Sequence, residues 1–173
     1  MSLQSVITTQ FSAVETAAGD LRSGSINTTL AKQTRTLADG SGLNQANRLF
    51  ADTATLAAEA SASLDLFDFS GAKDAQGQSF ALTKVKAIIL RNKASDATAI
   101  LRVGGEGSTA AFMAVNGSDT IHIADIGPGG EMALLAPSGA GYAVADTSNH
   151  LLKIANQSTT ASAEYDIVVV GAQ

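Results

Sequence analysis

The chain of 173 residues contains no cysteine and no tryptophan, and it has few charged side chains. The absence of cysteine excludes disulfides, thiolate metal sites and cysteine nucleophiles together. Charged residues make up 16% of the sequence, compared with about 25% in ordinary soluble domains. The formal net charge is −5, and the basic residues do not cluster as they do in proteins that bind nucleic acid. We therefore expect no DNA or RNA partner.

Long apolar runs are also missing from the sequence. No uninterrupted apolar stretch approaches the roughly 18 residues that span a membrane as a helix. The first fifteen residues, MSLQSVITTQFSAVE, have neither the basic region nor the apolar core of a secretory signal. We expect neither membrane insertion nor secretion.

The sequence instead contains many short aliphatic segments, rich in β-branched residues and separated by turn residues. Turn signals at intervals of about 8–12 residues are typical of antiparallel sandwiches and barrels. No helical pattern long enough for a βαβ crossover lies between them. We therefore predict an all-β fold, an antiparallel β-sandwich of jelly-roll type, with an immunoglobulin-like sandwich as the alternative. The expected strands include residues 6–11, 24–37, 84–90, 100–103, 112–115, 119–125, 131–136, 142–144, 150–155 and 164–170.

Residues 82–103 are expected to form the central hairpin of this sandwich. The first strand, 84–90, begins with alternating lysine and valine and ends apolar on both faces, so it should pass from an exposed rim into the core. Residues 92–96, Asn-Lys-Ala-Ser-Asp, favour a turn because their short side chains bond to nearby backbone. We expect Ile89→Asp to prevent folding.

The part of the chain before this hairpin is harder to interpret. Residues 1–35 are expected to form an irregular N-terminal arm or edge strands, and residues 36–173 the sandwich. A short helical turn is predicted near residues 43–48, followed by two strands. Phe67, Phe69 and Phe80 flank a polar loop at 70–79, and we expect them to pin its ends to the core.

Metal-binding patterns are weak in this sequence. Its two histidines are His122 and His150, and a metal site would need further ligands such as Asp119 or Asp125 to converge on them. Paired spacings such as HxH or HExxH are absent. We assign no metal-binding residue and no cofactor.

Catalytic patterns are weak as well. The nucleophile motif GxSxG does not occur, and the Asp65 and Asp68 pair lacks the Trp and Tyr lining of a carbohydrate cleft. The glycine-rich residues 104–108 and 127–130 lack the Gly-Lys-Ser/Thr ending of a phosphate-binding loop, so both are interpreted as turns. We assign no catalytic residue and expect a protein that is not an enzyme.

Several segments together resemble a group of small structural proteins of tailed bacteriophages. The similarity lies in an aliphatic strand ending in Arg-Asn, a Val-Gly-Gly strand end, a Pro-Gly-Gly turn before an aliphatic strand closed by Ala-Pro, and Leu-Lys-Ile-Ala-Asn before the last strand. The segments that carry it are GSGLNQANRLFADTATLAAEASASLDL, KVKAIILRN, RVGGEG, IGPGGEMALLAPSGAGYAVADTSNHLLKIANQ and AEYDIVVVG.

This resemblance implies a virion protein that decorates or cements the capsid surface and is made in the cytoplasm of the bacterial host. Its expected partners are the major capsid protein and further copies of itself, as a homodimer or homotrimer. One alternative is a tail, fibre or receptor-binding module with a ligand site in the loops at 70–79 and 138–141. A carbohydrate-binding protein is a further alternative. Deleting residues 1–20 is expected to weaken assembly or capsid attachment and to leave the sandwich folded.

Overall fold

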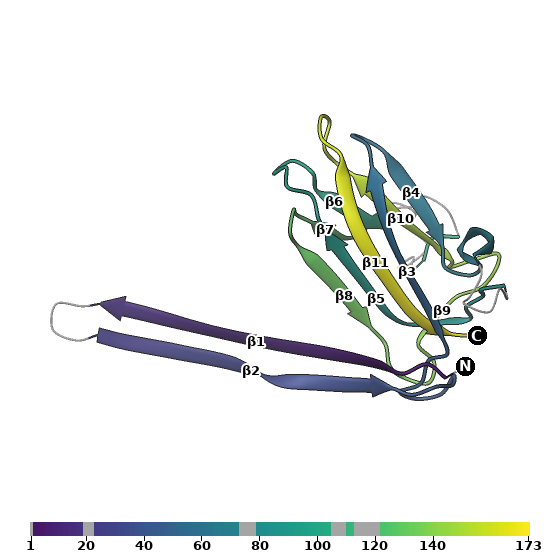
Figure 1. The fold of residues 1–173 in the computed structure, drawn as a ribbon, viewed down its shortest axis with the longest axis horizontal. Coiled ribbons are helices and arrows are strands. Elements are labelled where there is room, and N and C mark those ends of the chain that lie inside the picture. The colour runs from purple at the N-terminus through teal and green to yellow at the C-terminus, as the bar shows by residue number, and fades with distance from the viewer. Residues whose placement is uncertain (1, 19–22, 73–78, 105–109, 113–121) are drawn as a thin grey trace.

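The computed structural model describes residues 2–18, 23–72, 79–104, 110–112 and 122–173. It shows a two-layer β-sandwich from which a long hairpin projects (Figure 1). One 3-10 turn, η1 (Phe69–Gly71), is present, and the described ranges contain no α-helix. The all-β prediction is confirmed.

The projecting hairpin, which we call the arm, consists of β1 (Ser5–Ala18) and β2 (Ser23–Leu37). The two strands pair antiparallel as a separate two-stranded sheet. The predicted N-terminal arm and its strands are present, and the arm is an ordered hairpin with one register shift, between Thr9 and Phe11. Their alternating threonine and aliphatic residues favour such an extended backbone.

The sandwich consists of two antiparallel sheets. The first, which we call the front sheet, has the order β3-β11-β5-β8, and the short β9 pairs with the start of β5. The second has the order β4-β10-β6-β7. The front strands are β3 (Arg48–Leu56), β11 (Ala163–Ala172), β5 (Lys84–Asn92), β8 (Glu131–Leu135) and β9 (Tyr142–Ala143), and the others are β4 (Ser61–Asp65), β10 (Leu151–Asn156), β6 (Leu101–Gly104) and β7 (His122–Ile126).

The order of the strands is that of a jelly roll. Without the arm and the short β9, the remaining strands of the described chain run 1-8-3-6 in one sheet and 2-7-4-5 in the other. This arrangement is two Greek keys wrapped around one core. The predicted jelly-roll sandwich thus agrees with the observed topology.

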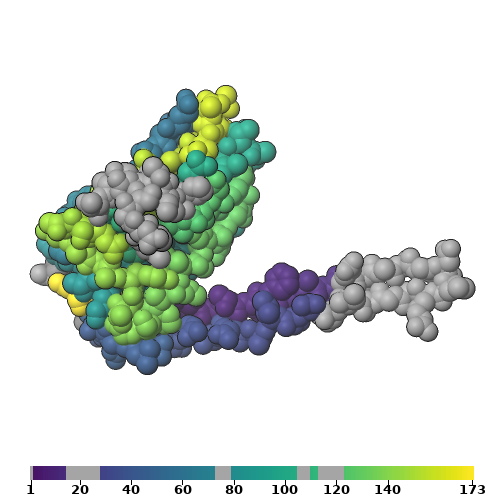
Figure 2. Space-filling view, turned by 180° about the vertical axis from the view of Figure 1, so that it is seen from behind, coloured from purple at the N-terminus to yellow at the C-terminus, as the bar shows by residue number. Residues whose placement is uncertain are grey.

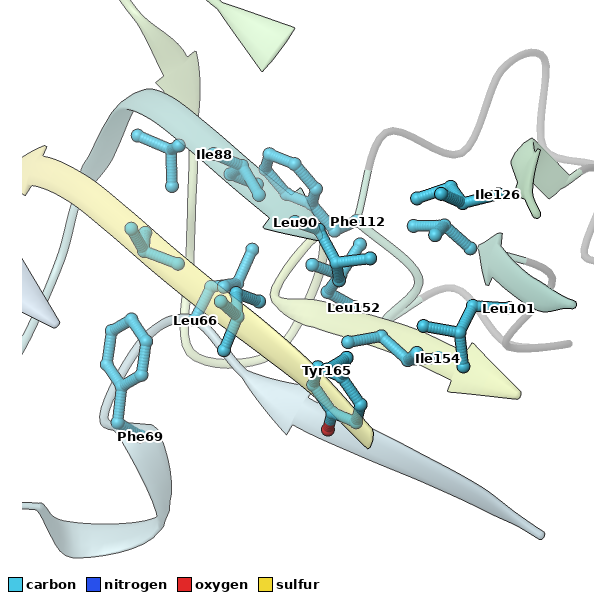
Figure 3. Close-up of a cluster of buried hydrophobic side chains, with 14 of the residues drawn as sticks. Leu66, Phe69, Ile88, Leu90, Leu101, Phe112, Ile126, Leu152, Ile154 and Tyr165 are labelled. Atoms are coloured by element: carbon cyan, nitrogen blue, oxygen red, sulfur yellow. The ribbon is translucent and has the colours of Figure 1, made fainter. Parts of the chain in front are cut away.

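The main core lies between the sheets and takes side chains from both (Figure 3). Fully buried aliphatic residues from β5, β6 and β10 meet at its centre. Phe69 and Phe80, which flank the polar loop, are 5% and 4% exposed, and their rings lie 4.8 Å apart edge to face. These two rings do hold the ends of that loop on the core, as predicted. The central residues are Ile88, Leu90, Leu101, Leu152 and Ile154.

The predicted central hairpin is wrong, because its two strands belong to different sheets. β5 pairs with β11 and β8, whereas β6 pairs with β10 and β7. The connection between them therefore crosses from one layer to the other. Asn92 holds this crossing, since its side-chain Nδ2 donates to the carbonyls of Ala99 (2.7 Å) and Ile126 (2.9 Å). At this position a turn-forming residue starts a connection between the two sheets. The sequence alone does not distinguish such a connection from a hairpin within one sheet.

A β-bulge in β5 decides which of its side chains enter the core. Val85 is opposite Gly171 and Ala87 is opposite Val170, so Lys86 is the extra residue. Beyond the bulge, Ile88 and Leu90 face the core, while Ile89 lies on the outer face and is partly exposed. The strand does not begin at an exposed rim, since Val85 and Lys86 are both buried.

The helical turn predicted near residues 43–48 is absent. Asn44 has a φ of 52°, and its N–H donates to the carbonyl of Pro137 rather than to a preceding turn. The N–H of Ala46 donates to the carbonyl of Ala38. This loop is therefore held by hydrogen bonds to other segments, and β3 follows it directly. The expected strand at 112–115 lies, apart from Phe112, outside the described residues.

The two neighbouring isoleucines of β5 provide a test of this register. Ile88→Ala should lower the free energy of unfolding by about 2–5 kcal/mol, because it leaves a cavity in the core. Ile89→Ala should cost about 1 kcal/mol or less, because the side chain is already partly in water. Urea unfolding followed by circular dichroism measures both. Equal losses would contradict the bulge at Lys86.

Candidate functional site

The two histidines considered as metal ligands belong to strands that are not neighbours in the sheet. His122 begins β7 and His150 immediately precedes β10, and β6 lies between these two strands. His150 lies near a carboxylate, with its Nε2 3.9 Å from Oδ2 of Asp65. Within the described ranges, no group of three or more histidine and acidic residues is placed to hold a metal ion. Asp119 lies outside those ranges.

The described aspartates that were considered for catalysis or for a metal site form hydrogen bonds and ion pairs within the fold. Asp65 accepts a hydrogen bond from the N–H of Phe67 (2.8 Å), and Asp68 accepts one from the N–H of Ser70 at the start of η1. Asp125 forms a two-pronged ion pair with Arg102, with N–O distances of 2.8 and 2.9 Å. These contacts fix turns and join two strands at the surface.

The arm is the first unusual feature of the surface. It extends away from the sandwich (Figure 2), and it exposes large apolar side chains that ordinarily lie inside a protein. Phe11 in β1 and Leu30 in β2 are cross-strand partners, 54% and 64% exposed. Val6 and Val14 are each 61% exposed. A two-stranded hairpin with no layer behind it is at best marginally stable in water.

The base of the arm is anchored in a second, smaller core. Leu37 is fully buried there, and Leu3 and Ile7 pack beside it. This cluster lies on the outer face of the front sheet, against Ala87 and Val170. The contact shows that apolar side chains of the arm fit the outer face of this sheet.

The same outer face carries an apolar row that is not fully covered, which we call the outer band. Ala51, Val168, Ile89 and Ala133 are register partners across β3, β11, β5 and β8. Ala51 and Ala133 are exposed, and Val168 and Ile89 are partly exposed. An antiparallel sheet whose outer face meets water normally presents polar residues there. The outer band departs from this pattern, because it is an unbroken apolar row across four strands.

Charged residues border the outer band on the side away from the base of the arm. The next row along the sheet contains Asp166, Arg91 and Glu131. The Thr53 hydroxyl donates to Asp166 at 2.7 Å, and this bond, with the nearby Lys93 ammonium at 3.4 Å, lowers the pKa of Asp166. The band thus has an apolar centre and a border that carries both acidic and basic side chains.

Lys86, the bulge residue of β5, bonds to two loops beside the front sheet. It is 1% exposed, and its ammonium donates to the carbonyls of Gly42 (3.2 Å), Gly139 (3.3 Å) and Ser138. Burial lowers the pKa of Lys86, and the nearby Lys84 ammonium lowers it further. Gly42 lies in the loop between the arm and β3. The buried cation therefore ties the loop that follows the arm to the loop after β8.

Sequence reasoning missed both the role of Lys86 and the outer band. A lysine within an aliphatic strand was the available signal, since a buried lysine must find acceptors. The outer band could not be recognised in the sequence, because its four residues come from separate strands. The loop at 138–141, considered as a ligand loop, turns two of its carbonyls towards Lys86.

Comparison of the chain with known proteins finds no relative. No protein-family model, curated protein or solved structure matches the chain. The described part of the chain also includes no helix long and apolar enough to cross a membrane. The arm and the outer band are therefore the features from which a function is argued.

The contacts of Lys86 predict the effect of removing its ammonium. Lys86→Met keeps most of the side-chain volume but leaves three carbonyls without their donor, so unfolding should become easier by about 1–3 kcal/mol. Lys84→Met, at a partly exposed position of the same strand, removes the same charge and should change stability by about 0.5 kcal/mol or less. Urea unfolding of both variants checks this. Equal stability of the two variants would contradict a structural role for the ammonium.

Proposed function

We propose that this protein is a structural component of a bacteriophage particle, of the capsid decoration or cement type, without enzymatic activity. The observation that carries the proposal is the arm, which exposes Phe11 and Leu30 far from the core. A single folded chain has no other part that could cover this projection. It is useful to a protein whose role is contact with other subunits.

The rest of the surface fits contact better than ligand chemistry. Few side chains are charged, so close packing against a neighbouring subunit removes few ions from water, which is the expensive step in burying a surface. The jelly-roll sandwich supplies a rigid layer behind the contact, and this architecture occurs in viral capsid domains. The sequence resemblance to small phage structural proteins adds independent support, and the major capsid protein is the proposed partner.

A tail, fibre or receptor-binding role is the competing proposal. It would use the loops at the end of the sandwich, where the described carbonyls of Ser138 and Gly139 are engaged by Lys86. A loop that is committed to an internal hydrogen-bond network is less suited to reshape around a ligand. The arm and outer band therefore favour the capsid role.

The proposal predicts where the protein lies in the particle. Cryo-electron microscopy should compare particles made with the intact gene and particles made without it. The capsid role predicts difference density of jelly-roll size on the outside of the head, and a lower temperature of head disruption when the protein is missing. Density confined to the tail would support the competing role. Identical particles would refute a virion function altogether.

A further inference from the structure

We propose that two copies of this chain exchange arms, so that the Phe11 and Leu30 face of each arm lies on the outer band of the other copy. The inference rests on the proposed structural function, because it specifies how copies of the protein join. Its test uses the isolated protein, so it can fail while the capsid role stands, and the reverse also holds.

The arm reaches its own front sheet only at its base. Leu3 and Ile7 contact that sheet, whereas the described side chains of residues 8–14 and 28–36 are exposed. Figure 1 shows the arm leading away from the sandwich beyond this point. Another molecule must therefore provide any cover for Phe11 and Leu30.

The outer band continues a contact that the arm already makes. The row of Leu49, Val170, Ala87 and Leu135 lies next to the band in the sheet register, and arm residues pack on the last three of these. A second arm placed on the band would extend the same apolar packing by one row. The band therefore suits an arm, and the copy that supplies the arm is chemically the same as the first.

Charge also favours a second copy as the occupant. Residues 1–37 contain three basic and two acidic side chains, and residues 38–173 contain eight basic and fourteen acidic side chains. The arm segment thus has a formal charge of +1 and the remainder −6. This complementarity lies in the net charges alone, because the row beside the band holds Arg91 between Asp166 and Glu131, and Lys93 pairs with Asp166. Two arms side by side would lack it.

The size of the contact explains why the exchange should be reciprocal. The arm beyond Ile7 is about 35 Å long and about 10 Å wide, from the usual strand rise and spacing. One face then offers roughly 350 Å², so a single arm-on-sheet contact buries at most about 700 Å² in total, which is below the range of stable interfaces. Two reciprocal contacts bury up to about 1,400 Å², which reaches that range.

The mass of the isolated protein tests the exchange first. Light scattering after size exclusion should give twice the 17.5 kDa chain mass. Phe11→Ser combined with Leu30→Ser should reduce it to the mass of one chain, with an unchanged circular dichroism spectrum, because neither side chain belongs to a core. Thr8→Ser combined with Thr34→Ser changes another exposed cross-strand pair of the arm and should leave the dimer intact. A monomeric wild type would refute the proposal.

A second variant tests the outer band, the surface that would receive the arm of the other copy. Ile89→Asp places a charge in the outer band but outside the main core, so, contrary to the expectation from the sequence, the protein should fold, and it should remain monomeric. Deleting residues 1–20 is a poorer test, because it removes Leu3 and Ile7 and uncovers the cluster at the base of the arm. A dimer that tolerates Ile89→Asp would overturn the proposed acceptor surface.

The absence of cysteine allows a direct test of which surfaces meet. Phe11→Cys protein mixed with Ile89→Cys protein should give a crosslinked dimer under copper–phenanthroline oxidation. Thr8→Cys mixed with Ile89→Cys is the matched control and should crosslink at least tenfold less, because Thr8 lies on the other side of the strand from Phe11. Efficient crosslinking of Phe11→Cys only to itself would show arm-to-arm pairing and would refute the exchange.

Discussion

The β-bulge at Lys86 is the constraint on which the rest of the structure depends. It turns Val85 and Ile88 towards the same core although they are an odd number of residues apart. It also directs the Lys86 ammonium away from that core and into the loops beside the arm. Gly171 makes the close approach possible, since a Cβ there would lie 2.5 Å from the carbonyl oxygen of Lys84.

The consequence is a front sheet with two apolar faces. Its inner face is covered by the second sheet, and the lower part of its outer face by the base of the arm. The outer band remains between this covered part and the charged row beyond it. The same chain therefore carries an apolar projection and an apolar surface that it does not fully cover. The exposed arm and the exposed band are both explained if the protein functions in contact with other subunits.

Much of the local structure could be predicted from the sequence. The aliphatic segments predicted as strands at 131–136, 150–155 and 164–170 became β8, β10 and β11, and Pro128 and its neighbouring glycines mark the turn between β7 and β8. Pairing could not be predicted in the same way. Residues 92–96 have the composition of a hairpin turn, yet they begin a crossing between sheets, because β5 already has a partner on each side. Ile88 and Ile89 are likewise identical in type, and only the bulge separates their environments.

The sequence by itself determined the class of structure and the chemistry that the chain lacks. Its turn spacing is typical of an antiparallel sandwich, and the absence of cysteine excludes thiol chemistry. Only the tertiary structure decided where contact with other molecules is possible. The outer band is made of single residues from four strands that are far apart in sequence. Such a surface exists only once the register of every ladder is set, because a shift of one residue would turn each of these side chains to the opposite face.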